Sequence, residues 1–263
     1  MSGRLDGKVA IITGAGQGIG LAYAHRFCAE GAKVVVAEIN PERAAAGITS
    51  LGDAGYGEDR VRLVATDISE EQSAEACVAA TVDTFGRVDV LLNNAAIYYD
   101  IDNTNNDPAY LKRVFDVNLH GAWLMSRAAA PRMVEEGGGR IINQSSSAAY
   151  MYQIPPADHF TEVGAFSYSQ TKWGIIGLTK FLAVQLGQFG VTVNCIAPGV
   201  TMTEATKRIV PEEFLPFVIM MTAMKKELQP EDITGSAVFF ASDDARMITG
   251  QVLCVDGGMA MPG

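Results

Sequence analysis

VAIITGAGQGIG, at Val9–Gly20, is the most informative stretch of the sequence. Val9–Thr13 forms a short apolar run, as expected of a strand that is buried on both faces of a sheet. A helical pattern follows from about Gly18 to Glu30, and Gly31 ends it. A strand, a glycine-rich turn and a helix in this order let a pyrophosphate reach a helix N-terminus. The stretch therefore predicts the start of a dinucleotide-binding sheet.

Short β-rich runs alternate with helical stretches along the rest of the chain. The predicted strands are Val9–Thr13, Val34–Ala37, Val61–Ala65, Val88–Asn93, Arg140–Asn143, Thr192–Ala197 and Gln251–Val255. The predicted helices after the first are Glu70–Phe85, Pro108–Met133 and Tyr168–Phe189. Since such alternation produces right-handed parallel units, we expect one α/β domain over residues 1–263. It is expected to be a Rossmann-like, doubly wound parallel sheet of about seven strands with helices on both faces.

Two segments depart from this alternation. Residues 148–166 form a long connection that contains several aromatic side chains. Residues 201–228 are apolar and rich in methionine, and Pro211 and Pro216 divide them into short pieces. We expect 201–228 to be a lid over the substrate, since lids protect hydride transfer by excluding water.

The composition narrows the classes of partner. The chain has 263 residues, a formal net charge of −10 and no run rich in lysine or arginine, so we expect neither nucleic acid nor an anionic membrane as partner. The first residues lack an apolar leader and no apolar stretch reaches membrane-spanning length, which favours a cytoplasmic protein. Four scattered cysteines form no C-x-x-C pair: Cys28, Cys77, Cys195 and Cys254. We interpret them as small buried side chains, and we predict no metal site.

The glycines and one acid indicate which cofactor binds. Gly14 and Gly18 permit close approach of a pyrophosphate, and Gly20 lets the helix pack closely against the sheet. Glu38 ends the second strand, where a carboxylate accepts both adenosine ribose hydroxyls and repels a 2′-phosphate. Residues 15–17 and 39–40 include no basic side chain. These features predict NAD rather than NADP, whereas the simplest alternative for Glu38 is a solvated acid at a strand end.

Tyr168 and Lys172 are four residues apart on a predicted helix, so their side chains share a face. A free tyrosine has a pKa near 10 and is a poor base at neutral pH. A nearby ammonium stabilises the phenolate and lowers that pKa, which makes the pair a proton-transfer device. Taken alone, such a pair is common on ordinary helices.

Other polar residues gather at the same predicted edge of the sheet. Ser145–Ser147 follow the fifth strand, Asn93–Ala95 follow the fourth, and Pro198-Gly199 closes the sixth. Ligands of open parallel sheets bind at the carboxyl ends of the strands. Asn118 lies inside the long predicted helix, where asparagine is a mediocre helix former. Each of these residues alone is typical of a cap or turn, but their joint placement indicates a site.

These motifs resemble the classical short-chain dehydrogenase/reductase family over essentially the whole chain. Thr13–Gly20 matches TGxxxGxG, and Asn93–Ala96 is similar to NNAG with alanine in the last place. Tyr168–Lys172 matches YxxxK, and Val255–Gly258 resembles the usual C-terminal segment. The interval from Ser146 to Tyr168 is longer than is usual in the family, which makes transfer of a relative's substrate unsafe.

The resemblance implies a role for each matching residue. Tyr168 corresponds to the acid/base, Lys172 to the residue that holds the nicotinamide ribose and lowers the tyrosine pKa, and Asn118 to the anchor of a relay water. The family's Asn-x-Ser-Ser ending selects Ser146 as the hydroxyl that binds the substrate oxygen. The implied cofactor contacts are Gly14, Gln17, Gly18, Ile19, Gly20, Glu38, Asp67, Ile68, Asn94, Ala95, Tyr168, Lys172, Val200 and Thr203.

Three functions remain open at this point. The first is an NAD-dependent oxidoreductase that acts on a secondary alcohol or ketone, with an apolar or aromatic substrate. The second is a 3-oxoacyl-thioester reductase, which Glu38 and the acidic composition disfavour. The third is a non-catalytic nucleotide-binding regulatory protein, which has no chemical need for Tyr168, Lys172, Ser146 and Asn118 together. The resemblance also implies a homotetramer.

Overall fold

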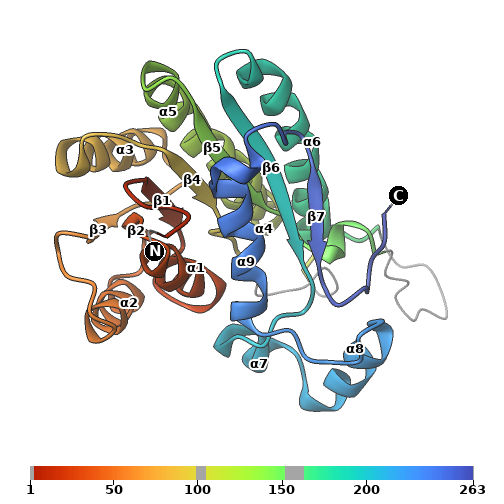
Figure 1. Ribbon diagram of the computed structural model, residues 1–263. Coiled ribbons are helices and arrows are strands. Elements are labelled where there is room, and N and C mark those ends of the chain that lie inside the picture. Colours follow the sequence, from red (N-terminus) through yellow and green to blue (C-terminus); the bar gives the residue numbers. More distant parts are fainter. Residues whose placement is uncertain (1–2, 99–104, 152–162, 263) are drawn as a thin grey trace.

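The computed structural model describes residues 3–98, 105–151 and 163–262. Its central feature is a sheet of seven parallel strands in the order β3-β2-β1-β4-β5-β6-β7 (Figure 1). The strands are β1 Val9–Thr13, β2 Lys33–Glu38, β3 Val61–Ala65, β4 Val90–Asn93, β5 Gly139–Gln144, β6 Val191–Pro198 and β7 Val252–Val255. The predicted doubly wound parallel sheet is confirmed, and each predicted strand is present within two residues of its expected bounds.

Helices cover both faces of the sheet because alternate strand residues point to opposite sides. Ala10 and Ile12 of β1 pack with α1 (Gly18–Ala29), α2 (Pro41–Asp53) and α9 (Pro230–Ala241). Ile11, between them, packs with the opposite layer, which consists of α3 (Glu71–Phe85), α5 (Gly121–Glu135) and α6 (Ser167–Gly187). In the described residues, no helix is long and apolar enough to cross a membrane.

The observed helices differ from the predicted ones in two respects. The stretch predicted as one helix from Pro108 to Met133 consists of α4 (Pro108–Phe115), a π-helical turn (Asp116–His120) and α5. Helices α2 and α9 lie in stretches for which the sequence predicts no element. Helix α2 buries only three residues, so its apolar stripe is narrow. Helix α9 is apolar on most of its circumference, which obscures the 3.6-residue period.

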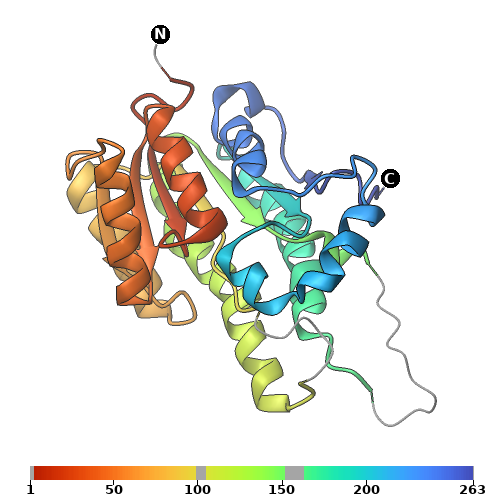
Figure 2. The ribbon, with the colours of Figure 1, turned by 90° about the horizontal axis from the view of Figure 1, so that it is seen from below.

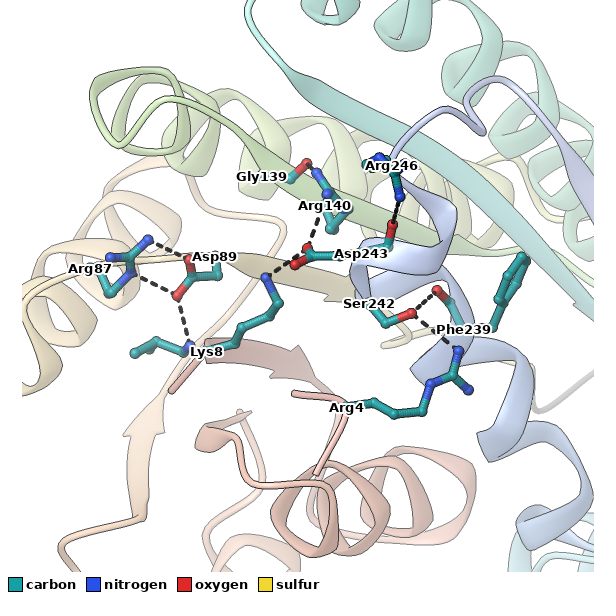
Figure 3. A network of polar contacts seen from close by, with 11 residues as sticks. Arg4, Lys8, Arg87, Asp89, Gly139, Arg140, Phe239, Ser242, Asp243 and Arg246 are labelled. Atoms are coloured by element: carbon teal, nitrogen blue, oxygen red, sulfur yellow. Dashed lines mark hydrogen bonds and ion pairs between the residues drawn. The ribbon is translucent and has the colours of Figure 1, made fainter. Parts of the chain in front are cut away.

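A network of polar side-chain contacts lies at the amino-terminal ends of the strands (Figure 3). Asp89 accepts hydrogen bonds from the main-chain N of Val9 at 2.9 Å and from two nitrogens of Arg87. Asp243 accepts hydrogen bonds from Lys8, which precedes β1, and from Arg140, the second residue of β5. The Asp243 pairs are exposed and contribute little free energy. Asp89 is buried, and its two hydrogen bonds with Arg87 hold it where it fixes the start of β1. The polar contacts at this end of the sheet therefore stabilise the fold.

Residues 201–228 lie beyond the carboxyl ends of the strands (Figures 1 and 2). They contain α7 (Glu204–Ile209), a 3₁₀ turn (Glu212–Phe214) and α8 (Leu215–Met221). A bridge between Thr201 and Leu228 brings the two ends of the segment together. The segment is thus a loop closed at its base, on the edge of the sheet opposite to the network of Figure 3.

The four cysteines are free thiols. Cys28, Cys77 and Cys195 are buried, as predicted, and Cys254 is half-buried. Burial raises the pKa of Cys195 to about 12, so this thiol is protonated at neutral pH.

Candidate active site

A cavity of about 1490 Å³ opens at the carboxyl ends of the strands. This volume exceeds the 300–1,000 Å³ or so that is usual for one small ligand, and it accommodates two. Of the residues to which the sequence assigns a catalytic or cofactor-binding role, only Asn118 is absent from its lining. The cavity therefore collects residues from the glycine-rich turn, the carboxyl ends of strands β2 to β6, helix α6 and the loop at 201–228.

The glycine-rich turn has the geometry that the sequence predicts. Gly14 and Gly18 have φ of 64° and 56°, which side chains rarely adopt. A Cβ at Gly20 would lie 2.2 Å from the carbonyl oxygen of Gly14, so only glycine fits there. The Oγ1 of Thr13 accepts the main-chain N–H groups of Asn94 and Ala95 at 2.9 and 3.1 Å. These bonds join the turn to the end of β4.

Glu38 is buried at the end of β2. Its Oε2 accepts the N–H of Gly16 at 3.2 Å, and its Oε1 accepts the N–H of Asn40 at 3.0 Å. The carboxylate is thus held in place at the cavity wall. Arg43 lines the same cavity, and it is a basic residue that the sequence reasoning did not weigh because it lies inside α2, five residues after Glu38.

The cavity is also lined by Asp67, Ile68 and Arg113. Oδ1 of Asp67 accepts both the N–H and the hydroxyl of Ser69, at 2.9 and 2.6 Å. Arg113, from α4, donates to the same Ser69 hydroxyl at 3.1 Å. These contacts hold Asp67 and Ile68 as a rigid loop end after β3.

Tyr168 and Lys172 lie on the first turns of α6. Nζ of Lys172 is 5.5 Å from the centre of the Tyr168 ring, and it donates to the carbonyl oxygen of Gln144 at 2.9 Å. Lys172 is buried, and burial lowers its pKa to about 8. Two residues before Tyr168, Phe166 has a left-handed φ of 45°, which costs a bulky residue on the order of 1–3 kcal/mol. The ammonium and the phenol are therefore adjacent at the start of a helix whose entry is strained.

The three serines after β5 have different partners. The hydroxyl of Ser145 donates to the carbonyl oxygen of Lys172 at 2.7 Å and is buried. The hydroxyl of Ser147 contacts the sulfur of Met259 at 3.9 Å. Ser146 is half-buried at the cavity wall, where its Oγ accepts the N–H of Ala148 at 3.2 Å. Of the three, Ser146 is the one whose hydroxyl proton no described residue accepts.

Asn118 occupies the π-helical turn between α4 and α5. Its Oδ1 accepts the N–H of Ile97 at 2.7 Å, and its Nδ2 donates to the carbonyl of Ile97 at 2.9 Å and to Thr171 at 3.4 Å. The side chain therefore joins the loop after β4 to α6 and does not reach the cavity. Single π-turns inside α-helices are frequent at functional sites, and the implied role of Asn118 in a water relay stays a prediction.

Comparisons with known proteins assign the family. The sequence model of the family described as enoyl-(acyl carrier protein) reductase matches residues 14–260. This match spans nearly the whole chain, from Gly14 of the glycine-rich turn to the C-terminal segment. The chain is a short-chain dehydrogenase/reductase.

Relatives of this dehydrogenase/reductase align over its full length. An uncharacterized oxidoreductase of Mycobacterium tuberculosis is 42% identical over 96% of this chain and 97% of its own. The (2S)-[(R)-hydroxy(phenyl)methyl]succinyl-CoA dehydrogenase subunit BbsD of Thauera aromatica is 34% identical, with 98% of each protein covered. The structure is similar to that of 7α-hydroxysteroid dehydrogenase complexed with NADH and 7-oxo glycochenodeoxycholic acid, with a TM-score of 0.86, 33% identity and coverage of 97% and 95%. The protein is thus an oxidoreductase.

The structure separates two asparagines of this dehydrogenase/reductase that are neighbours in sequence. Asn94 lines the cavity, but Asn93 is buried and does not. Nδ2 of Asn93 donates to Oδ1 of Asn143 at 2.9 Å, and Nδ2 of Asn143 donates to Thr179 at 3.0 Å. Asn93 therefore belongs to a buried network between β4, β5 and α6, and its grouping with the strand-end site residues is wrong.

The remaining lining of the cavity is mainly apolar. Within the predicted lid, Phe214, Phe217, Val218 and Met221 line the cavity, whereas the neighbouring Ile219 and Met220 do not. Tyr98, which sequence reasoning missed, lies with its ring centre 6.3 Å from that of Tyr168. Met151 also lines the cavity, while residues 152–162 lie outside the described part of the chain. The apolar lining residues near Tyr168 and the lid are Ile97, Met151, Met202, Phe214, Phe217, Val218, Met221 and Met259.

Proposed function

We propose that this oxidoreductase transfers a hydride between NAD(H) and a secondary alcohol or ketone with apolar or aromatic substituents. The observation that carries the proposal is the position of the buried Lys172 ammonium beside the Tyr168 ring, in one cavity with Ser146 and the glycine-rich turn. The cavity is large enough for a dinucleotide and a second molecule together.

The residues present fit a dinucleotide. Gly14, Gly18 and Gly20 line the cavity at the N-terminus of α1 without side chains, so a diphosphate can approach that N-terminus. Glu38 is oriented to accept the ribose hydroxyls, and Asp67 with Ile68 forms a wall for the adenine. Asn94, Ala95, Val200 and Thr203 line the part of the cavity that leads to Tyr168. When bound, the nicotinamide accepts or donates the hydride.

The chain's own residues handle the proton and the substrate oxygen. In alcohol oxidation, the Ser146 hydroxyl donates a hydrogen bond to the substrate oxygen, and the phenolate oxygen of Tyr168 accepts the proton of the substrate hydroxyl. The Lys172 ammonium stabilises the phenolate, which lowers the pKa of Tyr168. In ketone reduction, the Tyr168 hydroxyl returns the proton. Asn118 stays the proposed anchor of the water that connects Lys172 to solvent.

The apolar lining near Tyr168 supports a substrate without charge near its reacting carbon. We propose that residues 201–228 act as a lid. The 3₁₀ turn and α8 place four apolar side chains on the cavity, Phe214, Phe217, Val218 and Met221, and a bridge between Thr201 and Leu228 closes the base of the loop. The 7-oxo glycochenodeoxycholic acid in the complex of the similar hydroxysteroid dehydrogenase is a large alicyclic ketone.

A panel of secondary alcohols and ketones, followed by NADH absorbance, tests the proposal. The panel includes alicyclic, aryl and 3-oxoacyl-thioester substrates, each with NAD(H) and NADP(H). We expect turnover of alicyclic or aryl compounds with NAD(H). Exclusive turnover of the thioester would support a 3-oxoacyl-thioester reductase, and binding of NAD without any turnover would favour a regulatory protein.

Replacement of Glu38 by alanine is expected to narrow the preference for NAD over NADP. The carboxylate forms charge-assisted hydrogen bonds with ribose hydroxyls, so its loss should lower kcat/KM with NAD by about 10- to 100-fold. The value with NADP should stay equal or rise, because a repulsive charge is removed next to Arg43. Steady-state kinetics with both cofactors measures this ratio. Glu42→Ala, which removes an exposed acid from the first turn of α2, is the control. A wild type that prefers NADP would contradict the assignment.

We also propose that the protein is a homotetramer. Helices α5 and α6 expose Trp123, Trp173, Phe181 and Val184, the last two by 80% and 83%, and exposed apolar patches of this kind mark protein interfaces. Light scattering should give four times the chain mass of 28.0 kDa. The variant Phe181→Glu with Val184→Glu should give a smaller species, and a monomeric wild type at micromolar concentration would refute the proposal.

The buried free thiols fit the cytoplasmic setting expected from the sequence.

A further inference from the structure

A chain of hydrogen bonds runs from the protein core to the glycine-rich turn. Tyr23 of α1 is fully buried, and its hydroxyl donates to Oε1 of Gln144, the last residue of β5, at 2.8 Å. Nε2 of Gln144 donates to Oδ1 of Asn94 at 3.0 Å. Nδ2 of Asn94 donates to the carbonyls of Thr13 and Gly14, at 2.9 and 3.2 Å. Three elements far apart in the sequence thus meet behind the turn.

The contacts of Asn94 at the turn determine which group is the donor and which is the acceptor in every hydrogen bond of this series. Asn94 faces two main-chain carbonyls, so its NH₂ group must point at them and its Oδ1 must point at Gln144. Gln144 must then present its own NH₂ to Asn94 and its Oε1 to Tyr23. Tyr23 is left as the obligatory donor. Because burial raises its pKa far above the ordinary value, the hydroxyl keeps its proton at every physiological pH.

Gln144 also contacts the catalytic half of the cavity. Its main-chain carbonyl oxygen accepts a hydrogen bond from the ammonium of Lys172 at 2.9 Å. Lys172 is buried, and a buried ammonium needs such a partner. The side chain of one residue therefore braces the glycine-rich turn, while its main chain holds the lysine beside Tyr168.

We infer that Tyr23 and Gln144 are positioning residues, which hold the cofactor turn and Lys172 at a fixed separation. The inference rests on the proposed function, since it assigns the glycine-rich turn to cofactor binding and Lys172 to proton transfer. Loss of the Tyr23 hydroxyl leaves Oε1 of Gln144 without its donor, and the Gln144 amide is then free to rotate. The turn loses the contact of Asn94, and the carbonyl that holds Lys172 moves with it.

A double-mutant cycle tests this coupling. Tyr23→Phe removes only the hydroxyl, and Gln144→Met keeps the length of the side chain but removes both of its hydrogen bonds. Each variant should raise the Kd for NAD, measured by fluorescence titration, by about 3- to 30-fold, a share of what a lost buried hydrogen bond costs. Each should also move the pH profile of alcohol oxidation to higher pH, because a displaced Lys172 stabilises the Tyr168 phenolate less. In the Gln144→Met background, Tyr23→Phe should add nothing further.

A third variant tests the direction of the hydrogen bonds. Gln144→Glu preserves size and the acceptor for Tyr23, but it places a carboxylate oxygen against Oδ1 of Asn94. We expect it to bind NAD no better than Gln144→Met. Binding of NAD by Gln144→Glu as tight as that of the wild type would overturn the inference.

Thr179→Val is the matched control. It removes a buried hydroxyl that accepts a hydrogen bond from Nδ2 of Asn143. Because this bond is not part of the hydrogen-bond series from Tyr23 to the turn, the variant should lower Tm without changing the NAD Kd or the pH profile. The inference fails if folded Tyr23→Phe matches the wild type in both readouts, if the two substitutions are additive, or if Thr179→Val changes the readouts equally. A wild type that binds no NAD would instead count against the proposed function.

Discussion

Replacement of Tyr168 by phenylalanine is expected to reduce kcat by about 10²–10⁴-fold, the range typical of lost general acid–base catalysis. The substitution keeps the ring, which packs beside Tyr98 and Lys172. It removes only the oxygen that exchanges the proton with the substrate. Folding and the Kd for NAD should therefore stay close to the wild-type values. Kinetics with a substrate found in the panel, together with a fluorescence titration of NAD, measures both.

The serines provide a second readout of the same mechanism. Ser146→Ala should lower kcat, while Ser147→Ala should do so far less, because the Ser147 hydroxyl contacts Met259. Tyr56→Phe, on the loop between α2 and β3, controls for the loss of a tyrosine hydroxyl outside the cavity. A folded, NAD-binding Tyr168→Phe enzyme with a near wild-type rate would show that the mechanism is wrong.

Lys172→Met should reduce turnover by a comparably large factor. It should, however, leave the Tm equal to or above that of the wild type. Without the ammonium, the Tyr168 phenol ionises nearer its ordinary pKa of about 10, and each pH unit of that shift lowers the phenolate fraction at neutral pH about tenfold. The pH profile of oxidation should therefore move to higher pH. The Kd for NAD should rise as well, because Lys172 is the residue proposed to hold the nicotinamide ribose.

The stability prediction follows from the sign of the pKa shift. Burial lowers the pKa of Lys172 from its ordinary 10.5 to about 8, so the folded state releases a proton that the unfolded state keeps between these values. At neutral pH the buried charge costs on the order of 3 kcal/mol, and this cost is relieved as pH rises through that window. Methionine has a similar length and no charge, so Lys172→Met should unfold at a Tm equal to or above that of the wild type.

The exposed Lys180 on the same helix offers the matched control. Lys180→Met should leave kcat, the pH profile and the NAD Kd unchanged. If Lys172→Met unfolds at a clearly lower Tm while its pH profile stays at the wild-type position, Lys172 is a structural residue and not the one that sets the pKa of Tyr168.

Local pattern was sufficient for most of the fold. Strands β1, β2 and β4 are short, mainly buried apolar runs, and neighbouring residues pack into opposite cores, as Ile11 and Ile12 do. The glycine-rich turn was equally readable, because a Cβ at Gly20 meets the backbone of its own turn. Helices α2 and α9 were not predicted, since one has a narrow apolar stripe and the other is apolar on most sides.

The sequence by itself determined the sheet, its carboxyl edge and the residue types gathered there, because these follow from interactions between residues a few positions apart. Only the tertiary structure decided which neighbouring polar side chain faces the cavity and which joins the core, as it does for Asn94 and Asn93. It also revealed the π-turn at Asn118 and the contact of Tyr23 with Gln144, 121 residues away. Such hydrogen bonds depend on the register in which strands and helices pack, and a periodicity of two or 3.6 residues carries no information about that register.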